Sequence, residues 1–178
     1  MAKTKDKTNV VEGKNKMNEI RIEKVVLSVG GTDDILEKGI KLLAKITSGK
    51  PIKKRSNKRI PSLNVRPGLD VGGMVTLRGK KADEVLKRLL GAIDFKLKKR
   101  QFSENSFSFG IKEYIEIPGM EYQRDVGIMG LDVSVAFAKP GKRVVRKKIK
   151  RGRLPKRQNI SAEEIIEFME KKFNIKLK

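Results

Sequence analysis

Apolar and polar residues alternate in two segments of the second half of the chain. Residues 107–117 are apolar at almost every second position, and residues 131–137 repeat the pattern over a shorter span. This alternation is typical of strands with one buried face. A β-branched run at 19–29 predicts a strand partly covered on both faces, and shorter strands are expected around 63–65 and 74–78. Together these segments predict an antiparallel sheet.

Two segments in the first half have apolar residues at helical spacing. The first should begin at a cap provided by Thr32 or Asp33 and should end at Gly49. A second helix is expected over 82–93, with apolar residues on one side and charged residues on the other. The apolar positions of the first helix are Ile35, Leu36, Ile40, Leu43 and Ile46.

A third helix has the most explicit start signal in the chain. Ser161 and Glu164 have the spacing of a capping box, and Ile160 and Ile165 can form the accompanying hydrophobic staple. Three amphipathic helices and an antiparallel sheet predict an α+β fold, in which helices cover one face of the sheet. A basic loop should project from this sheet, and a basic arm should lead to the C-terminal helix.

The order of these elements predicts one folded domain with a tail. Residues 1–17 are polar and carry no periodic pattern, so a flexible tail is expected. Residues 18–138 should form the α+β core, and residues 139–178 should add the basic arm and the C-terminal helix to the same domain.

Charge narrows the function. The 178 residues include 43 Lys and Arg against 21 Asp and Glu, which gives a net charge of +22. Such a surface repels itself unless a polyanion neutralises it, so nucleic acid is the first expected partner. Cys and His are absent, which excludes zinc sites, thiolate nucleophiles and imidazole chemistry. No segment has the composition of a signal peptide or a membrane span, so we expect a cytoplasmic protein with no membrane partner.

The positive charge is concentrated in two segments. Seven Lys or Arg lie between Lys50 and Arg66, before the first acidic residue of that stretch, Asp70. Eleven lie in residues 139–157, which contain no acid, and this arm is expected to become ordered only on its partner. A solvated turn and a disordered linker or targeting tract are the alternatives. The expected phosphate contacts of the arm are Lys142, Arg143, Arg146, Lys147, Lys148, Arg151 and Arg153.

Other candidate sites have simpler explanations. The stretch GGMVTLRGK has the wrong spacing for a phosphate-binding loop and lacks the Ser or Thr that would hold magnesium. The acid pairs at 33–34 and 163–164 lie at helix N-termini, where capping and the helix dipole account for them. Phe107 and Phe109 share the apolar parity of their strand, so core packing explains them better than stacking on bases. We therefore expect no enzyme, metal or cofactor.

Six motifs in order resemble one family. They are IRIEKVVLSVG from Ile20, the helix ending in TSGKP, RIPSLNVRPG, VTLRGKKADEVLKRLL, FSFGIKEYIEIPGMEY and MGLDVSV. The chain resembles, over residues 18–173, the large-subunit ribosomal protein numbered five, which binds 5S rRNA. The basic arm followed by a helix is similar to the archaeal and eukaryotic form of that family.

The resemblance implies a structural protein of the large subunit, in the central protuberance, with the uncovered face of its sheet on 5S rRNA. It also implies contact with the large rRNA, a bridge to a protein of the small-subunit head, and a loop near P-site tRNA. That loop would consist of Lys53, Lys54, Arg55, Ser56, Asn57, Lys58 and Arg59. The residues implied to face 5S rRNA are Ser28, Gly49, Leu63, Thr76 and Arg78.

Three of these positions depart from the family pattern. Ser28, Gly49 and Leu63 stand where Asn, Gln and Phe are usual, so 5S contact should depend more on backbone and cations here. Two other classes of function remain open. A non-ribosomal RNA chaperone would discriminate weakly between RNAs, and an RNA-cleaving enzyme would need acids beside the basic loop, where only Asp70 is available.

Overall fold

The computed structural model describes residues 16–177, and the first part of the expected flexible tail, residues 1–15, lies outside the described residues. Within the described residues the main sheet has six strands in the order β2-β3-β1-β7-β6-β5, and each neighbouring pair is antiparallel. The strands are β1 (Arg21–Gly30), β2 (Ile52–Arg55), β3 (Asp70–Leu77), β5 (Phe102–Ser103), β6 (Ser106–Ile111) and β7 (Leu131–Ala138).

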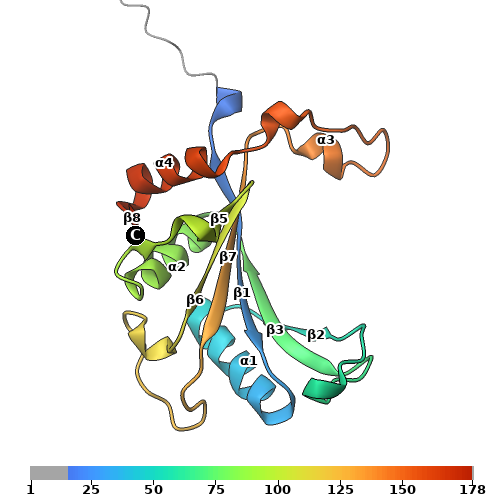
Figure 1. The fold of residues 1–178 in the computed structure, drawn as a ribbon, viewed down its shortest axis with the longest axis vertical. Helices are drawn as coiled ribbons and strands as arrows, with labels where there is room; N and C mark the ends of the chain where they lie inside the picture. The colour runs from blue at the N-terminus through green and yellow to red at the C-terminus, as the bar shows by residue number, and fades with distance from the viewer. Residues whose placement is uncertain (1–15, 178) are drawn as a thin grey trace, which may run out of the picture.

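Three amphipathic helices cover one face of this sheet (Figure 1). They are α1 (Asp33–Thr47), α2 (Lys80–Gly91) and α4 (Ala162–Phe173), close to the predicted ranges. Two short parallel strands, β4 (Lys96–Leu97) and β8 (Lys176–Leu177), pair beside them. Single turns complete the described chain: η1 (Lys16–Asn18), η2 (Pro61–Leu63), η3 (Lys99–Gln101), η4 (Tyr114–Glu116), α3 (Arg143–Arg146) and η5 (Lys156–Gln158). The predicted α+β class is confirmed.

The core lies between the sheet and the helices. Its centre is aromatic: the ring of Phe107 stacks with Phe102, Phe109 and Phe137 at centroid distances of 5.3, 5.9 and 5.8 Å, and Phe168 of α4 meets Phe137 edge-on. Stacked rings add to the free energy gained by burying their area. The prediction that Phe107 and Phe109 pack in the core is therefore confirmed.

The start of α4 is as predicted, with one difference. The N–H of Glu164 donates to Oγ of Ser161 at 3.3 Å, and the two staple residues Ile160 and Ile165 are fully buried. The carboxylate of Glu164 bonds Lys139 Nζ at 3.0 Å. Lys139, the first cation of the arm, is thus held on α4 at the point where the chain leaves β7.

The end of α1 also follows the prediction, but its start and outer face do not. Thr32 occupies the cap position without a side-chain capping bond, and Ser48 ends the helix in the left-handed conformation just before Gly49. Ile35, predicted to face the core, is 54% exposed, because the helix turns Leu36 and Leu43 inward instead.

The prediction for residues 107–117 was wrong in its second half. Strand β6 stops at Ile111, opposite the first residue of β7, Leu131, so no partner strand remains for the residues that follow. The chain turns into η4, where Tyr114 is fully buried and Ile115 faces out. Burying the large tyrosine ring overrides the alternation of smaller apolar residues.

Two predictions for the basic loop were also wrong. Residues 63–65, expected as a strand, lie in the turn η2 and in a single bridge between Ile60 and Val65. Residues 52–55, expected on a projecting loop, form the edge strand β2 against β3. All four residues of β2 are exposed, so the strand lacks the alternation by which strands are recognised. In the arm, where Pro and Gly were expected to interrupt any helix, the one-turn helix α3 forms.

Candidate nucleic-acid interface

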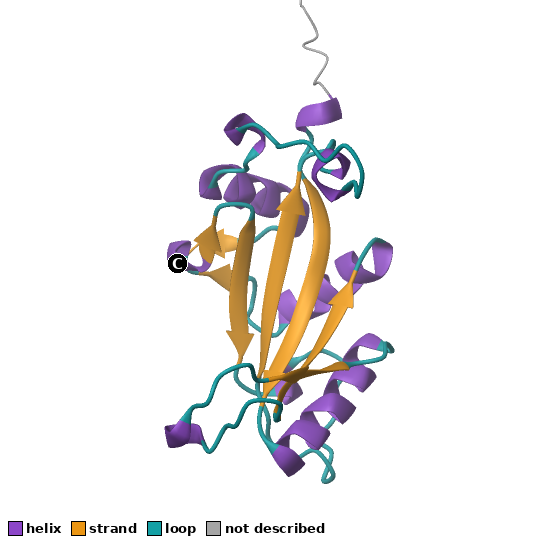
Figure 2. Cartoon of the chain, turned by 90° about the vertical axis from the view of Figure 1, so that its right-hand side faces the viewer, coloured by secondary structure: helices purple, strands orange, loops and turns teal. Residues whose placement is uncertain are grey.

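The face of the sheet opposite the helices is uncovered within the described part of the chain, as Figure 2 shows. We call it the open face. Strand register defines its members: Thr76 and Ser134 both pair with Val26, and Ser108 pairs with Ser134, which makes one row across four strands. The open face consists of Lys24, Val26, Ser28, Gly72, Met74, Thr76, Ser106, Ser108, Gly110, Asp132, Ser134 and Ala136.

Side chains of the open face are small and rich in hydroxyl groups. Hydroxyls both donate and accept hydrogen bonds, as the 2′-OH groups of RNA do. Small side chains also leave a smooth surface, against which a broad, shallow RNA minor groove can lie. The open face lacks aromatic residues, so its chemistry suits recognition of backbone and shape and does not suit base stacking.

The structure gathers three of the five predicted 5S-facing residues. Ser28 and Thr76 lie on the open face, and Arg78 follows β3 directly with the same parity and is exposed. Gly49 lies elsewhere: its N–H donates to Oγ1 of Thr47 at 3.3 Å, and a side chain there would point at Val75, which faces the helices. Leu63 also lies elsewhere, in η2, and is 65% exposed.

The seven residues predicted for the tRNA-side loop divide between a strand and a turn. Register places Lys54 opposite Gly72 on the open face, whereas Lys53 lies opposite Gly73 on the helix side. Arg55 pairs with Asp70 at 3.3 Å, an exposed ion pair of little energetic weight. The stretch 56–59 forms the turn that follows, in which Oγ of Ser56 donates to the carbonyl of Lys58 at 2.8 Å.

Two backbone bonds close the segment beyond this turn. The N–H of Ser56 donates to Leu69 and the N–H of Gly68 donates to Ser56, each at 2.8 Å. Between these bonds, Arg59 and Arg66 border a depression of about 250 Å³. Neither arginine has an ion-pair partner among residues 16–177. We call residues 52–69 the basic hairpin, which presents unneutralised cations from a closed loop.

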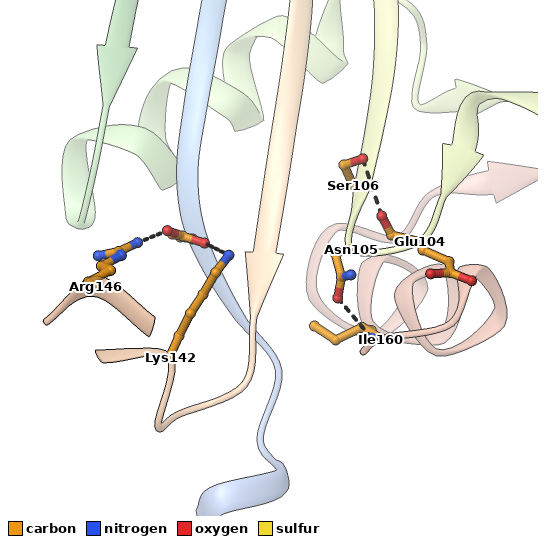
Figure 3. Close-up of polar contacts among 7 residues, drawn as sticks. Glu104, Asn105, Ser106, Lys142, Arg146 and Ile160 are labelled. Carbon is orange, nitrogen blue, oxygen red and sulfur yellow. Dashed lines mark hydrogen bonds and ion pairs between the residues drawn. The ribbon is translucent and has the colours of Figure 1, made fainter. Parts of the chain in front are cut away.

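The arm, residues 139–157, supplies the second set of cations. Lys142 and Arg146 both contact the carboxylate of Glu23 on β1 (Figure 3). The other predicted contacts have no ion-pair partner within the described chain: Arg143, Lys147, Lys148, Arg151 and Arg153. In Figure 1 the arm lies at one end of the sheet and the basic hairpin at the other, both on the side away from α2 and α4.

Other kinds of site find no support in the part of the chain that is described. Among residues 16–177, no three acidic residues are grouped closely enough to hold a metal ion. None of the described helices combines the length and the apolar composition needed to cross a membrane.

The family model for the C-terminus of ribosomal protein uL5 matches residues 70–168, more than half of the chain. The chain belongs to the uL5 family of ribosomal proteins. The large ribosomal subunit protein uL5 of Nanoarchaeum equitans is 43% identical over 90% of this chain and 97% of its own. The proteins of the same name from Sulfurisphaera tokodaii and Methanobrevibacter smithii are each 39% identical, over 90% of this chain and 93% and 96% of their own.

Family membership confirms the predicted resemblance and the coarse function that it implied. The protein is a structural component of the large ribosomal subunit, and its partner is ribosomal RNA. Sequence reasoning missed Lys24, Ser108 and Ser134 on the open face, although each lies between buried residues in a strand and has the parity opposite to them. It also missed Glu23, whose role depends on a strand irregularity that has no sequence signature.

Proposed function

We propose that the open face binds 5S rRNA and that the protein thereby helps to attach 5S rRNA to the large rRNA in the central protuberance. The observation that carries this proposal is the position of the open face: it is smooth, hydroxyl-rich and uncovered, and it lies between the basic hairpin and the arm. Cations at both ends would hold phosphates while the centre meets the ribose edge. No catalytic step is assigned to the chain.

The tip of the basic hairpin is the part proposed to lie near P-site tRNA. It extends beyond the edge of the sheet, and its cations Lys58, Arg59 and Arg66 lack partners in residues 16–177. A loop closed at its base can reach a second RNA without disturbing the sheet. Lys54, on the open face, is assigned to 5S rRNA instead.

The bridge to the small-subunit head is proposed for the segment between β6 and β7, residues 112–130. This segment has an excess of acids in a strongly basic chain: Glu113, Glu116, Glu121 and Asp125 against Lys112 and Arg124. It also exposes Ile115, Tyr122 and Ile128, the last to 69%. Acids repel RNA but attract a basic protein, and exposed apolar side chains suit a protein interface.

Binding to purified 5S rRNA tests the main proposal against the chaperone alternative. The competitor is excess tRNA, and the comparison is a structured RNA of matched size at near-physiological salt. We expect a preference of at least about tenfold for 5S rRNA, since specific binding exceeds non-specific binding by far more than salt-dependent attraction allows. Equal affinities would reject 5S rRNA as the specific partner and favour the chaperone.

The salt dependence of this binding tests the role of the cations. If the complex neutralises on the order of eight phosphates, affinity should fall by roughly four decades between 50 and 200 mM salt. A shallow slope would mean that the hydroxyl-rich centre, and not the basic ends, supplies the affinity.

A further inference from the structure

The arm is folded into a closed loop. The N–H of Lys147 donates to the carbonyl of Arg143, and the N–H of Gly152 donates to the carbonyl of Val144, each at 3.2 Å. Gly152 has no room for a side chain, because a Cβ atom there would lie 2.6 Å from Cγ1 of Val144. Between these bonds lies the tip of the arm, residues 147–151, with four cations around Ile149, which is 77% exposed.

Glu23 fastens this loop to the sheet. The register between β1 and β7 shifts between Ile22 and Lys24, so Glu23 is the extra residue of a β-bulge. Bulges redirect side chains, and here the carboxylate is only 12% exposed and meets both Lys142 and Arg146. A carboxylate withdrawn from water and shared by two cations makes a stronger link than an exposed ion pair does.

Internal ion pairs neutralise few of the arm cations. Three of the eleven meet carboxylates of this chain: Lys142 and Arg146 on Glu23, and Lys139 on Glu164. Within residues 16–177 the other eight have no ion-pair partner, and they include all four at the tip. The arm therefore divides into cations that fasten it and cations that are available to an external anion.

We infer that the Glu23–Lys142–Arg146 cluster positions the tip of the arm as a second RNA contact, which takes the phosphate backbone of a double-helical RNA outside the segment held by the open face. The inference rests on the proposed function. Four cations spaced along one short loop suit successive phosphates, and an apolar side chain among them suits the ribose. Glu23 acts through the arm and is a positioning residue.

The effect of Glu23→Gln on RNA affinity distinguishes positioning from simple charge. This variant removes a negative charge, so electrostatic attraction alone predicts tighter RNA binding. Positioning predicts the opposite sign, because a loosened arm must be ordered again when it binds. The matched control is Glu104→Gln, which makes the same charge change at an exposed residue of the same end of the sheet (Figure 3).

The first measurement is trypsin cleavage at residues 147–151 of the full chain without RNA. We expect Glu23→Gln to be cleaved about three- to tenfold faster than the wild type and Glu104→Gln to match the wild type. The second is affinity for a perfect RNA duplex of about 20 base pairs. Glu23→Gln should bind about three- to tenfold more weakly than Glu104→Gln. Equal or tighter binding by Glu23→Gln would overturn the inference.

A second variant keeps the inference testable if Glu23→Gln lowers the melting temperature of the whole protein. Gly152→Val places atoms against Val144 inside the arm, far from β1 and without any change of charge. It should weaken duplex binding similarly and leave the preference for 5S rRNA over a size-matched RNA intact. Unchanged duplex affinity would reject the arm as an RNA contact. Loss of 5S preference in the wild type would instead reject the proposed function.

Discussion

Asn105 and Ile160 are joined by two hydrogen bonds. The N–H of Ile160 donates to Oδ1 of Asn105 at 2.9 Å (Figure 3), and the N–H of Asn105 donates to the carbonyl of Ile160 at 3.1 Å. The carbonyl of Asn105 also accepts from the N–H of Phe137 at 2.8 Å. The turn between β5 and β6 therefore fastens β7 to the residue that precedes α4.

Asn105→Ala should destabilise the protein by about 2–3 kcal/mol. Asn105 has a φ of +60°, a left-handed conformation that costs alanine about 1–2 kcal/mol, and loss of the side-chain bond adds about 1 kcal/mol. Urea unfolding measures the difference. Asn105→Gly is the control, because glycine keeps the conformation and loses only the bond. A glycine variant as unstable as the alanine variant would show that the backbone conformation costs nothing.

Enlarging Ser134 should weaken binding to 5S rRNA because it raises the centre of the open face. Ser134→Gln adds bulk without charge in the row shared with Thr76 and Ser108, and we expect affinity to fall by about tenfold. Ser134→Ala keeps the surface flat and removes the hydroxyl, so its expected loss is about threefold or less. Filter binding with 5S rRNA measures both. If glutamine is tolerated as well as alanine, RNA does not lie against this row.

Lys53 and Lys54 are neighbours in β2 that face opposite sides of the sheet. A Cβ atom on Gly73, the partner of Lys53, would lie 3.1 Å from Ile40 of α1, whereas Gly72, the partner of Lys54, belongs to the open face. Lys54→Ala should therefore weaken 5S binding by about three- to fivefold, the effect of one lost phosphate contact, and Lys53→Ala should leave it unchanged. Equal losses would mean that β2 contributes only its general charge.

The same hairpin provides a test of the proposed tRNA contact. Arg59→Ala and Arg66→Ala at its tip should weaken tRNA-dependent steps of translation and spare 5S affinity, since both residues lie beyond the sheet. Reconstituted subunits assayed for P-site tRNA binding give the first quantity, and purified components give the second. A fall in 5S affinity as large as that of Lys54→Ala would assign the tip to 5S rRNA.

Elements with one buried face were predictable from sequence because burial leaves a periodic record. In β7, apolar residues alternate from Leu131 to Phe137 as the structure requires, and Ser161 begins α4 through the predicted capping bond. Strand β2 had no such record, since all its residues are exposed and its ladder uses only backbone groups. Tyr114 shows the converse, because a continuing alternation concealed the place where the partner strand ends.

The candidate site was only partly predictable for a related reason. Ser28 and Thr76 could be placed because they lie inside recognisable motifs, while Gly49 and Leu63 belong to motifs that the fold carries away from the open face. Ser108 and Ser134 come together only through the pairing of β6 with β7, which a single sequence does not specify. Glu23 depends on a bulge, and one extra residue in a strand leaves the apolar pattern ambiguous.

Lys24 provides the most direct test of the claim that the open face binds 5S rRNA. It lies on that face opposite Ala136, and Lys41, exposed on α1, lies on the covered side. Lys24→Glu and Lys41→Glu change the net charge equally, so general attraction to RNA falls equally in both. The account predicts that Lys24→Glu lowers affinity for 5S rRNA by about tenfold or more and Lys41→Glu by less than about threefold. Equal losses in the two variants would contradict it.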